Sequence, residues 1–250
     1  SADDAIMIHP SASLWPKSSG TNYTIHTYGD LINQGTILQY IDVIAHGGVS
    51  NEGTWLSDLT LNGEVVRTLS GFFDTSVTLA TPITLSDSAS IDTLITDDFP
   101  LTFADTDNVL SLNILSGDLD TNGIVWFGVN DPTETLQVGN ITARYLVITG
   151  NHKMRSYTND VLFTWIKEDA SLSERSLASA EDITFTGDLL NQGSISRYLT
   201  PFLYGSVDNQ GTWSPTTTRL AWEGDPLAIY SFRMADDESS LGEVVTSSVT

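Results

Sequence analysis

One long internal repeat constrains the fold of this chain more than any other feature. Residues 29–55 read GDLINQGTILQYIDVIAHGGVSNEGTW, and residues 187–213 read GDLLNQGSISRYLTPFLYGSVDNQGTW. The two segments align without a gap at an offset of 158 residues (187 − 29), and 14 of their 27 positions are identical. A repeat of this kind, with Asn and Gly at fixed places, is typical of stacked structural rungs.

A smaller unit recurs inside each copy. It consists of Asn-x-Gly, then Thr or Ser, then Ile or Trp, and it returns after 18 residues, beginning at Asn33, Asn51, Asn191 and Asn209. Three short strands and three turns need about this length for one coil of a solenoid. Asn and Gly tolerate left-handed backbone conformations, and stacked Asn side chains can hydrogen-bond from rung to rung. We therefore expect an all-β, right-handed parallel β-helix with rungs of ~18–20 residues and an interior of Ile, Leu and Val.

The rest of the chain is made of short apolar or alternating segments bounded by Gly, Asn and Asp, which is the pattern of all-β proteins. Only residues 172–180 read as a helix. Because no linker rich in Pro, Gly or Ser divides the chain, we expect a single elongated solenoid over residues 1–250. The segment 150–186, which is richer in charge, is the candidate for an insertion or a break between halves. The alternative is two β-sandwich domains, each holding one copy of the repeat.

Composition excludes several classes of partner. The chain has 10 Lys and Arg against 32 Asp and Glu, a formal net charge of −22, which disfavours nucleic acid and anionic membrane surfaces. No segment has the roughly 20 apolar residues of a membrane-spanning helix, so we expect no membrane insertion. The absence of cysteine excludes disulfides and thiolate metal sites.

The Asn-x-Gly-Thr units, together with LTLNG at 59–63 and TLSG at 68–71, resemble the repeats of large secreted bacterial surface proteins. These are the hemagglutinin-like and adhesin-like parallel β-helix proteins, in which GDLxNxGTI recurs as a rung. The resemblance covers about a third of the chain. It implies an extracellular or cell-surface, non-enzymatic protein that acts in adhesion, glycan binding or surface structure. The alternatives are a self-assembling surface or filament subunit and a polysaccharide-cleaving β-helix enzyme.

The aromatic residues of the repeat are the candidates for glycan binding. Trp55 and Trp213 occupy equivalent positions in the two copies, and so do Tyr40 and Tyr198. Aromatic rings in a row on a flat β surface can stack on sugar rings. The competing interpretation is that both tryptophans fill the interior, since they occupy the place that Ile takes in the neighbouring units.

Asp118, Asp120 and Asn122, followed by Gly123, match the first half of a calcium-binding loop, in which alternating oxygen atoms converge on one ion. The acid expected at the twelfth loop position is missing, because that residue is Val129. The same residues are also explained by the repeat, because GDLDTNG resembles GDLINQG and GDLLNQG, so we expect no cofactor, with calcium as the alternative.

No catalytic residue is predicted. The four histidines are dispersed without the spacing of a zinc site, no G-x-S-x-G motif occurs, and the few basic residues form no cluster.

Overall fold

The structure is a computed structural model that describes residues 5–18, 20–62, 67–96, 99–128, 137–154, 157–174, 181–220, 232–234 and 243–246. Every regular element in these ranges is a β-strand, and the strand pairs are parallel. The predicted parallel β-solenoid with rungs of about 18 residues is thereby confirmed. The β-sandwich alternative is wrong, because sandwich sheets consist of antiparallel strands. The described residues form no helix that could span a membrane.

The chain divides into two compact units, Ser1–Gly123 (unit 1) and Ile124–Thr250 (unit 2), and each holds one copy of the repeat. The division falls after Gly123, upstream of the segment 150–186 that the sequence indicated for an insertion or a break. Described residues of that segment belong to strands that continue the ladder of unit 2. The predicted helix at 172–180 is also wrong where it is described, because Ser171–Glu174 is a strand; residues 175–180 lie outside the described residues.

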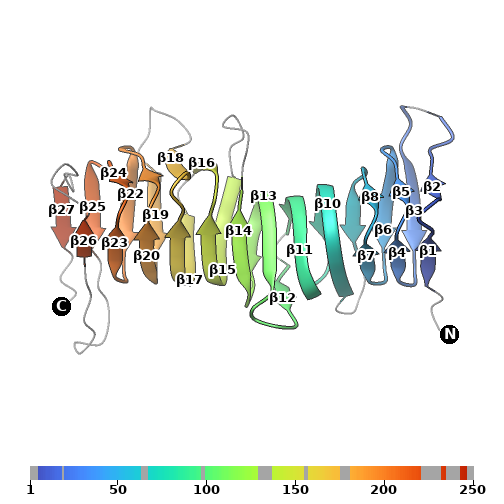
Figure 1. Cartoon of the computed structure of the whole chain (residues 1–250), viewed down its shortest axis with the longest axis horizontal. Helices are drawn as coiled ribbons and strands as arrows, with labels where there is room; N and C mark the ends of the chain where they lie inside the picture. Colours follow the sequence, from blue (N-terminus) through green and yellow to red (C-terminus); the bar gives the residue numbers. More distant parts are fainter. Residues whose placement is uncertain are drawn as a thin grey trace. The chain divides into compact units, whose positions relative to one another are not determined.

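The strands of each unit stack in chain order (Figure 1). Unit 1 contains β1 (Ile6–Ile8), β2 (Ser13–Leu14), β3 (Tyr23–Thr27), β4 (Leu31–Asn33), β5 (Thr36–Ile37), β6 (Ile41–Ala45), β7 (Val49–Asn51), β8 (Thr54–Trp55), β9 (Leu59–Leu61), β10 (Arg67–Leu79), β11 (Ile83–Ile95), β12 (Leu101–Phe103) and β13 (Val109–Asp120). Unit 2 contains β14 (Ile124–Phe127), β15 (Gln137–Ile148), β16 (Asn151–Met154), β17 (Tyr157–Ile166), β18 (Ser171–Glu174), β19 (Glu181–Phe185), β20 (Asp188–Asn191), β21 (Ser194–Ile195), β22 (Leu199–Leu203), β23 (Val207–Asn209), β24 (Thr212–Trp213), β25 (Thr217–Leu220), β26 (Phe232–Met234) and β27 (Glu243–Thr246).

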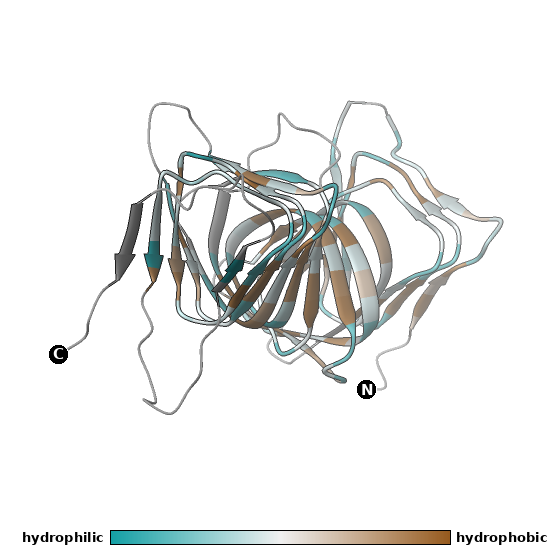
Figure 2. Ribbon diagram, turned by 60° about the vertical axis from the view of Figure 1, so that its left-hand side comes forward, coloured by the Kyte–Doolittle hydropathy of each residue, from teal (hydrophilic) through white to brown (hydrophobic). Residues whose placement is uncertain are grey.

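Alternation along each short strand builds the core. Successive side chains of a strand point to opposite faces, and Figure 2 shows apolar and polar residues alternating along the strands. Leu31, Val49 and Leu69 are in register on consecutive rungs and are all buried. Burying one such side chain contributes roughly 1.5–3 kcal/mol. Ladders of aliphatic residues therefore hold the rungs together, as the sequence predicted.

The structural repeat is longer than the segment that is similar in sequence. In unit 1, Ile8 pairs with Asn33, and in unit 2, Ile166 pairs with Asn191, at the same separation of 25 residues. On the following turn, the carbonyl oxygen of Ala12 accepts a hydrogen bond from Thr36, just as that of Ala170 accepts one from Ser194. Each unit thus contains the same cassette of rungs, extending upstream of the recognised repeat, and equivalent positions differ by 158 in number.

Buried asparagines bridge the rungs, as expected. Asn33 Nδ2 donates to Asn51 Oδ1 at 2.7 Å, and Asn191 Nδ2 donates to Asn209 Oδ1 at 2.5 Å. The expected reason for the glycines is wrong, because Gly53 and Gly211 do not have positive φ. A Cβ atom on Gly53 would lie 2.2 Å from the carbonyl oxygen of Gly35 on the preceding rung. Close approach of two rungs, and not a left-handed backbone, requires glycine there.

Replacing Asn33 by alanine is expected to destabilise unit 1 by about 2–3 kcal/mol. The amide of Asn33 is fully buried, donates to Asn51 Oδ1 and to the carbonyl oxygen of Thr54, and accepts from the Gly35 amide. Its loss leaves those buried groups without these partners. Urea unfolding followed by circular dichroism measures the change. Gln34→Ala is the control, since this neighbouring side chain bonds only at the surface, and it should cost less than about 0.5 kcal/mol.

Candidate ligand-binding site

Trp55 and Trp213 lie inside the solenoid. Each is 2% exposed and in register with the isoleucine of the preceding rung. The indole Nε1 of Trp55 donates to the carbonyl oxygen of Ser57 at 2.7 Å, and that of Trp213 contacts Thr218 Oγ1 at 3.1 Å. Neither ring can therefore stack on a glycan. Their prediction as binding residues is wrong, and the competing interpretation of interior packing is confirmed.

The equivalent tyrosines lie in the turns before β6 and β22. Tyr40 is 37% exposed and has a φ of 71°, the left-handed region that a non-glycine residue seldom adopts. Tyr198 is partly exposed, and the guanidinium of Arg197 lies 4.4 Å from its ring centroid and donates to its hydroxyl. With the tryptophans buried, the two tyrosines do not form the predicted strip with them.

The segment predicted as a calcium loop is not a loop. Asp118 and Asp120 are exposed residues of strand β13, separated by the buried Leu119. The side chain of Asn122 bridges to the preceding rung, where Oδ1 accepts from the Phe103 amide at 2.7 Å and Nδ2 donates to the Phe103 carbonyl at 3.1 Å. The prediction of a convergent ligand loop is therefore wrong in its geometry. No group of three or more His, Cys, Asp or Glu placed to hold a metal occurs among the residues that the structure describes.

Unit 2 instead carries aromatic rings on the outside of its sheet. Strands β14, β15 and β17 direct Val125, Leu146 and Ile166 inward, so the alternating positions face outward. These outward positions hold four partly exposed aromatic residues, which we call the aromatic face: Trp126, Tyr145, Phe163 and Trp165.

The aromatic face is ordered by the rung spacing. Trp126 and Trp165 are each in register with Val147 of the strand between them, so their backbones lie two rungs apart, about 9.6 Å. The ammonium Nζ of Lys167 lies 4.6 Å from the Trp126 ring and 4.5 Å from the Trp165 ring. Tyr145 and Phe163 contact edge to face, with centroids 6.4 Å apart. The aromatic face therefore consists of rings on three consecutive strands, with the Lys167 ammonium between the two indoles.

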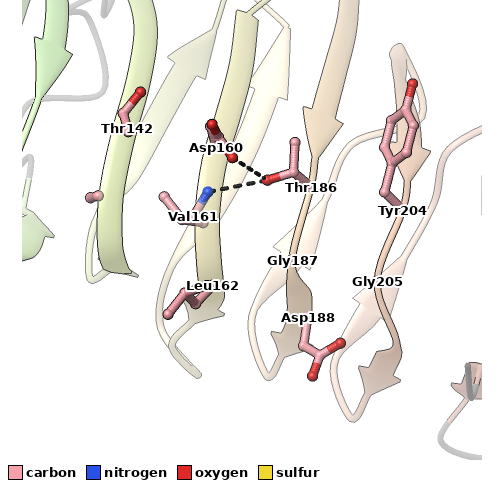
Figure 3. A pocket seen from close by; sticks show the side chains of 10 residues that line it. Thr142, Asp160, Val161, Leu162, Thr186, Gly187, Asp188, Tyr204 and Gly205 are labelled. Atoms are coloured by element: carbon pink, nitrogen blue, oxygen red, sulfur yellow. Dashed lines mark hydrogen bonds between the residues drawn. The ribbon is translucent and has the colours of Figure 1, made fainter. Parts of the chain in front are cut away.

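A groove adjoins the aromatic face. It has a volume of about 590 Å³ and is lined on successive rungs by, among others, Thr142, Asp160, Thr186, Asp188 and Tyr204. Figure 3 shows these side chains on neighbouring strands. Asp188 is in register with Phe163, which connects the groove to the aromatic face.

Internal hydrogen bonds fix part of the groove. The hydroxyl of Thr186 accepts from the Val161 amide at 3.2 Å and lies 3.2 Å from Asp160 Oδ1 (Figure 3). Asp188 Oδ1 accepts from the Ser206 amide at 2.7 Å. Gly187 and Gly205 also line the groove, and a Cβ atom on either one would meet the backbone of the preceding rung. The groove therefore offers carboxylate and hydroxyl groups in a fixed arrangement.

The part of unit 1 that is equivalent to the groove, which we call the corner, has a different surface. The positions equivalent to Thr186 and Tyr204 are Tyr28 and His46, whose rings stack at a centroid distance of 4.8 Å. The cassette backbone is thus shared, while the side chains at this corner are not. We expect ligand binding at the groove to be a property of unit 2.

Another polar group of unit 2, His152, lies in the interior. It is 1% exposed, its ring meets that of Phe127 edge to face at 5.7 Å, and neither ring nitrogen has a hydrogen-bond partner among the described residues. Burial lowers the pKa of His152 to about 4. The Phe127 backbone raises this pKa, but by less than burial lowers it. His152 is therefore neutral at physiological pH.

Sequence reasoning missed the aromatic face and the groove. The aromatic face lies outside the repeated segments, and the groove combines residues from several rungs. The signal that was available is the alternation in IVWF at 124–127 and FTWI at 163–166. It places Trp126 and Trp165 outward once the neighbouring Val and Ile are assigned to the core.

Comparison of the chain with protein-family models, with curated proteins and with solved structures gives no match. A function is therefore inferred from the aromatic face and the groove themselves.

Proposed function

We propose that this is a non-enzymatic extracellular or cell-surface protein that binds carbohydrate, and that unit 2 holds the glycan on its aromatic face and in the adjoining groove. The observation that carries the proposal is the row of outward rings, with Trp126 and Trp165 two rungs apart, beside a groove of hydroxyl and carboxylate groups. The resemblance of the repeats to adhesin-like β-helix proteins supports the same role.

The chemistry of the two surfaces is complementary to a sugar chain. Apolar C–H faces of pyranose rings pack against aromatic rings, as ligand sites in general combine aromatic surface with a few placed polar groups. Asp160 and Asp188 can accept hydrogen bonds from sugar hydroxyls, and Lys167 can donate one. Trp126 and Trp165 lie two rungs apart with the Lys167 ammonium between their rings, so one sugar chain on this surface can contact both rings and Lys167.

The charge of the site favours neutral glycans. Two carboxylates line the groove, and the chain as a whole carries a formal charge of −22. A uronate or sulfate group would be repelled by both. We therefore expect neutral polysaccharides to be retained in preference to acidic ones.

Affinity electrophoresis and pull-down with soluble and insoluble polysaccharides, with and without calcium, test the proposal. Trp126→Ala and Tyr204→Ala should each weaken retention of the bound glycan at least about tenfold, or about 1.4 kcal/mol. Neither side chain belongs to the buried core, so both variants should still fold, and urea unfolding measures any loss of stability separately from the loss of binding.

Tyr28→Ala is the matched control, because Tyr28 occupies the position in unit 1 that is equivalent to the groove and is 69% exposed. It should bind as the wild type does. Sugar released in the same incubations would show a polysaccharide-cleaving enzyme and would contradict the non-enzymatic role. Absence of retention, together with oligomers that Trp126→Ala dissociates, would instead assign the aromatic face to self-assembly.

A further inference from the structure

Two histidines that are far apart in the sequence lie side by side in unit 1. His26 belongs to β3 and His46 follows β6, and these strands pair in parallel, so one turn of the solenoid brings the two rings together. His26 Nδ1 lies 3.2 Å from His46 Nε2. The ring of His26 is exposed and that of His46 is partly exposed. Two imidazole nitrogens thus converge at the surface.

The ring of Tyr28 packs against the two histidines. Tyr28 stacks on His46 with a centroid distance of 4.8 Å and an interplanar angle of 9°, and it lies 6.3 Å from His26. The two imidazoles are themselves nearly parallel, at an angle of 17°. This stack restricts the motion of both histidines, which reduces the entropy lost when they bind one ligand together.

We propose that His26 and His46 form a two-histidine site for a borderline divalent metal ion of the Zn²⁺, Ni²⁺ or Cu²⁺ type. Imidazole nitrogen suits these ions, and Zn–N bonds of about 2.0–2.1 Å place two tetrahedral ligand atoms roughly 3.3–3.4 Å apart. The observed separation of 3.2 Å between Nδ1 of His26 and Nε2 of His46 is close to that value. Binding of one ion requires both rings to turn so that their lone pairs meet at it, which replaces the hydrogen bond between His26 and His46.

Metal binding moves a proton within one imidazole ring and leaves the charge of the protein unchanged. In the neutral pair one ring donates its N–H to the other across the 3.2 Å contact. When the ion binds, this proton moves through water to the second nitrogen of the same ring, and both facing nitrogens become ligands. Water completes the coordination, because the described residues include no group of three or more His, Cys, Asp or Glu placed to hold a metal. The site therefore keeps open positions for an external ligand.

The duplicated cassette provides substitutions that its backbone already accommodates. The positions equivalent to His26 and His46 in unit 2 are Thr184 and Tyr204. The variants H26T and H46Y therefore each remove one metal-binding imidazole and replace it with the residue found at the equivalent position of unit 2. Urea unfolding of both variants should match the wild type, which separates loss of the site from loss of the fold.

Isothermal titration of the full chain with ZnCl2, NiSO4 and CuSO4 tests the site. The wild type should bind one ion tightly enough to saturate, and H26T and H46Y should each weaken this binding at least about tenfold. The Cu²⁺ form should give an electron paramagnetic resonance spectrum of two nitrogen ligands. His9→Ala, at an exposed histidine elsewhere in unit 1, should retain the site. Binding that persists in H26T and H46Y, or no saturable binding by the wild type, would overturn the proposal.

Discussion

Lowering the pH from 7 to below 4 is expected to destabilise unit 2 by about 3 kcal/mol through His152 alone. In the unfolded chain this histidine takes up a proton near pH 6.5, whereas in the folded chain its pKa is lowered to about 4. Between these values the unfolded state binds more protons, so the free energy of unfolding falls as the pH falls. The stabilisation is complete above about pH 6.5 and is lost progressively toward pH 4.

The variant His152→Leu isolates this effect. His152 is in register with the buried Leu172, so leucine matches the side chain of the next rung. The variant removes two buried nitrogens that lack partners among the described residues, and it should be about 1 kcal/mol more stable than the wild type at pH 7. Urea unfolding at pH 7, 5.5 and 4 should show this advantage growing as the pH falls. His9→Leu controls for the loss of a histidine at an exposed position; an equal change there would contradict the assignment to His152.

The second large effect is expected from Gly211→Ala, which should cost unit 2 about 3 kcal/mol or more. An added Cβ atom would lie 2.1 Å from the carbonyl oxygen of Gly193, which accepts the inter-rung hydrogen bond of the Thr212 amide. Either the rungs separate or this bond breaks. In a strand free of such a contact, Gly→Ala would stabilise the protein by about 0.4–1 kcal/mol, so the sign of the change is diagnostic.

Thr212→Ala is the control for Gly211→Ala. The Thr212 side chain is exposed, and the substitution leaves its backbone amide in place. It should change the free energy of unfolding by less than about 0.5 kcal/mol, measured by urea unfolding. A stabilised Gly211→Ala would show that the two rungs do not approach closely.

The β-solenoid could be predicted from the sequence because the period of the repeat equals the number of residues in one rung. The 18-residue period of Asn33 and Asn51 is the separation at which one rung lies on the next. Contacts between rungs of unequal length could not be predicted in this way. His26 and His46 are 20 residues apart, and Phe163 pairs with Asp188 across 25, so their proximity depends on turn lengths that the repeat does not define.

The direction of the aromatic side chains was harder to predict. A tryptophan in a short strand packs inward or outward according to the register of that strand, and a shift of one residue exchanges the two faces. Trp55 and Trp213 follow the register of the repeat into the core. Trp126 and Trp165 lie where no repeat defines the register. The boundary at Gly123 was not visible either, because no change of composition marks it.

The shared cassette has a consequence for engineering. Gly47 and Gly205 occupy the same place, and each would meet the backbone of Gly29 or Gly187 if it carried a Cβ atom. The corner is therefore held by main-chain packing that is common to both copies, and its outward side chains can be transplanted. Grafting Thr and Tyr onto positions 28 and 46 should reproduce part of the polar lining of the groove on unit 1. Unit 1 has no counterpart of Trp126 or Tyr145, and the positions equivalent to Phe163 and Trp165 hold Ala5 and Met7, so such a chimera would measure how much of the binding the two grafted side chains supply.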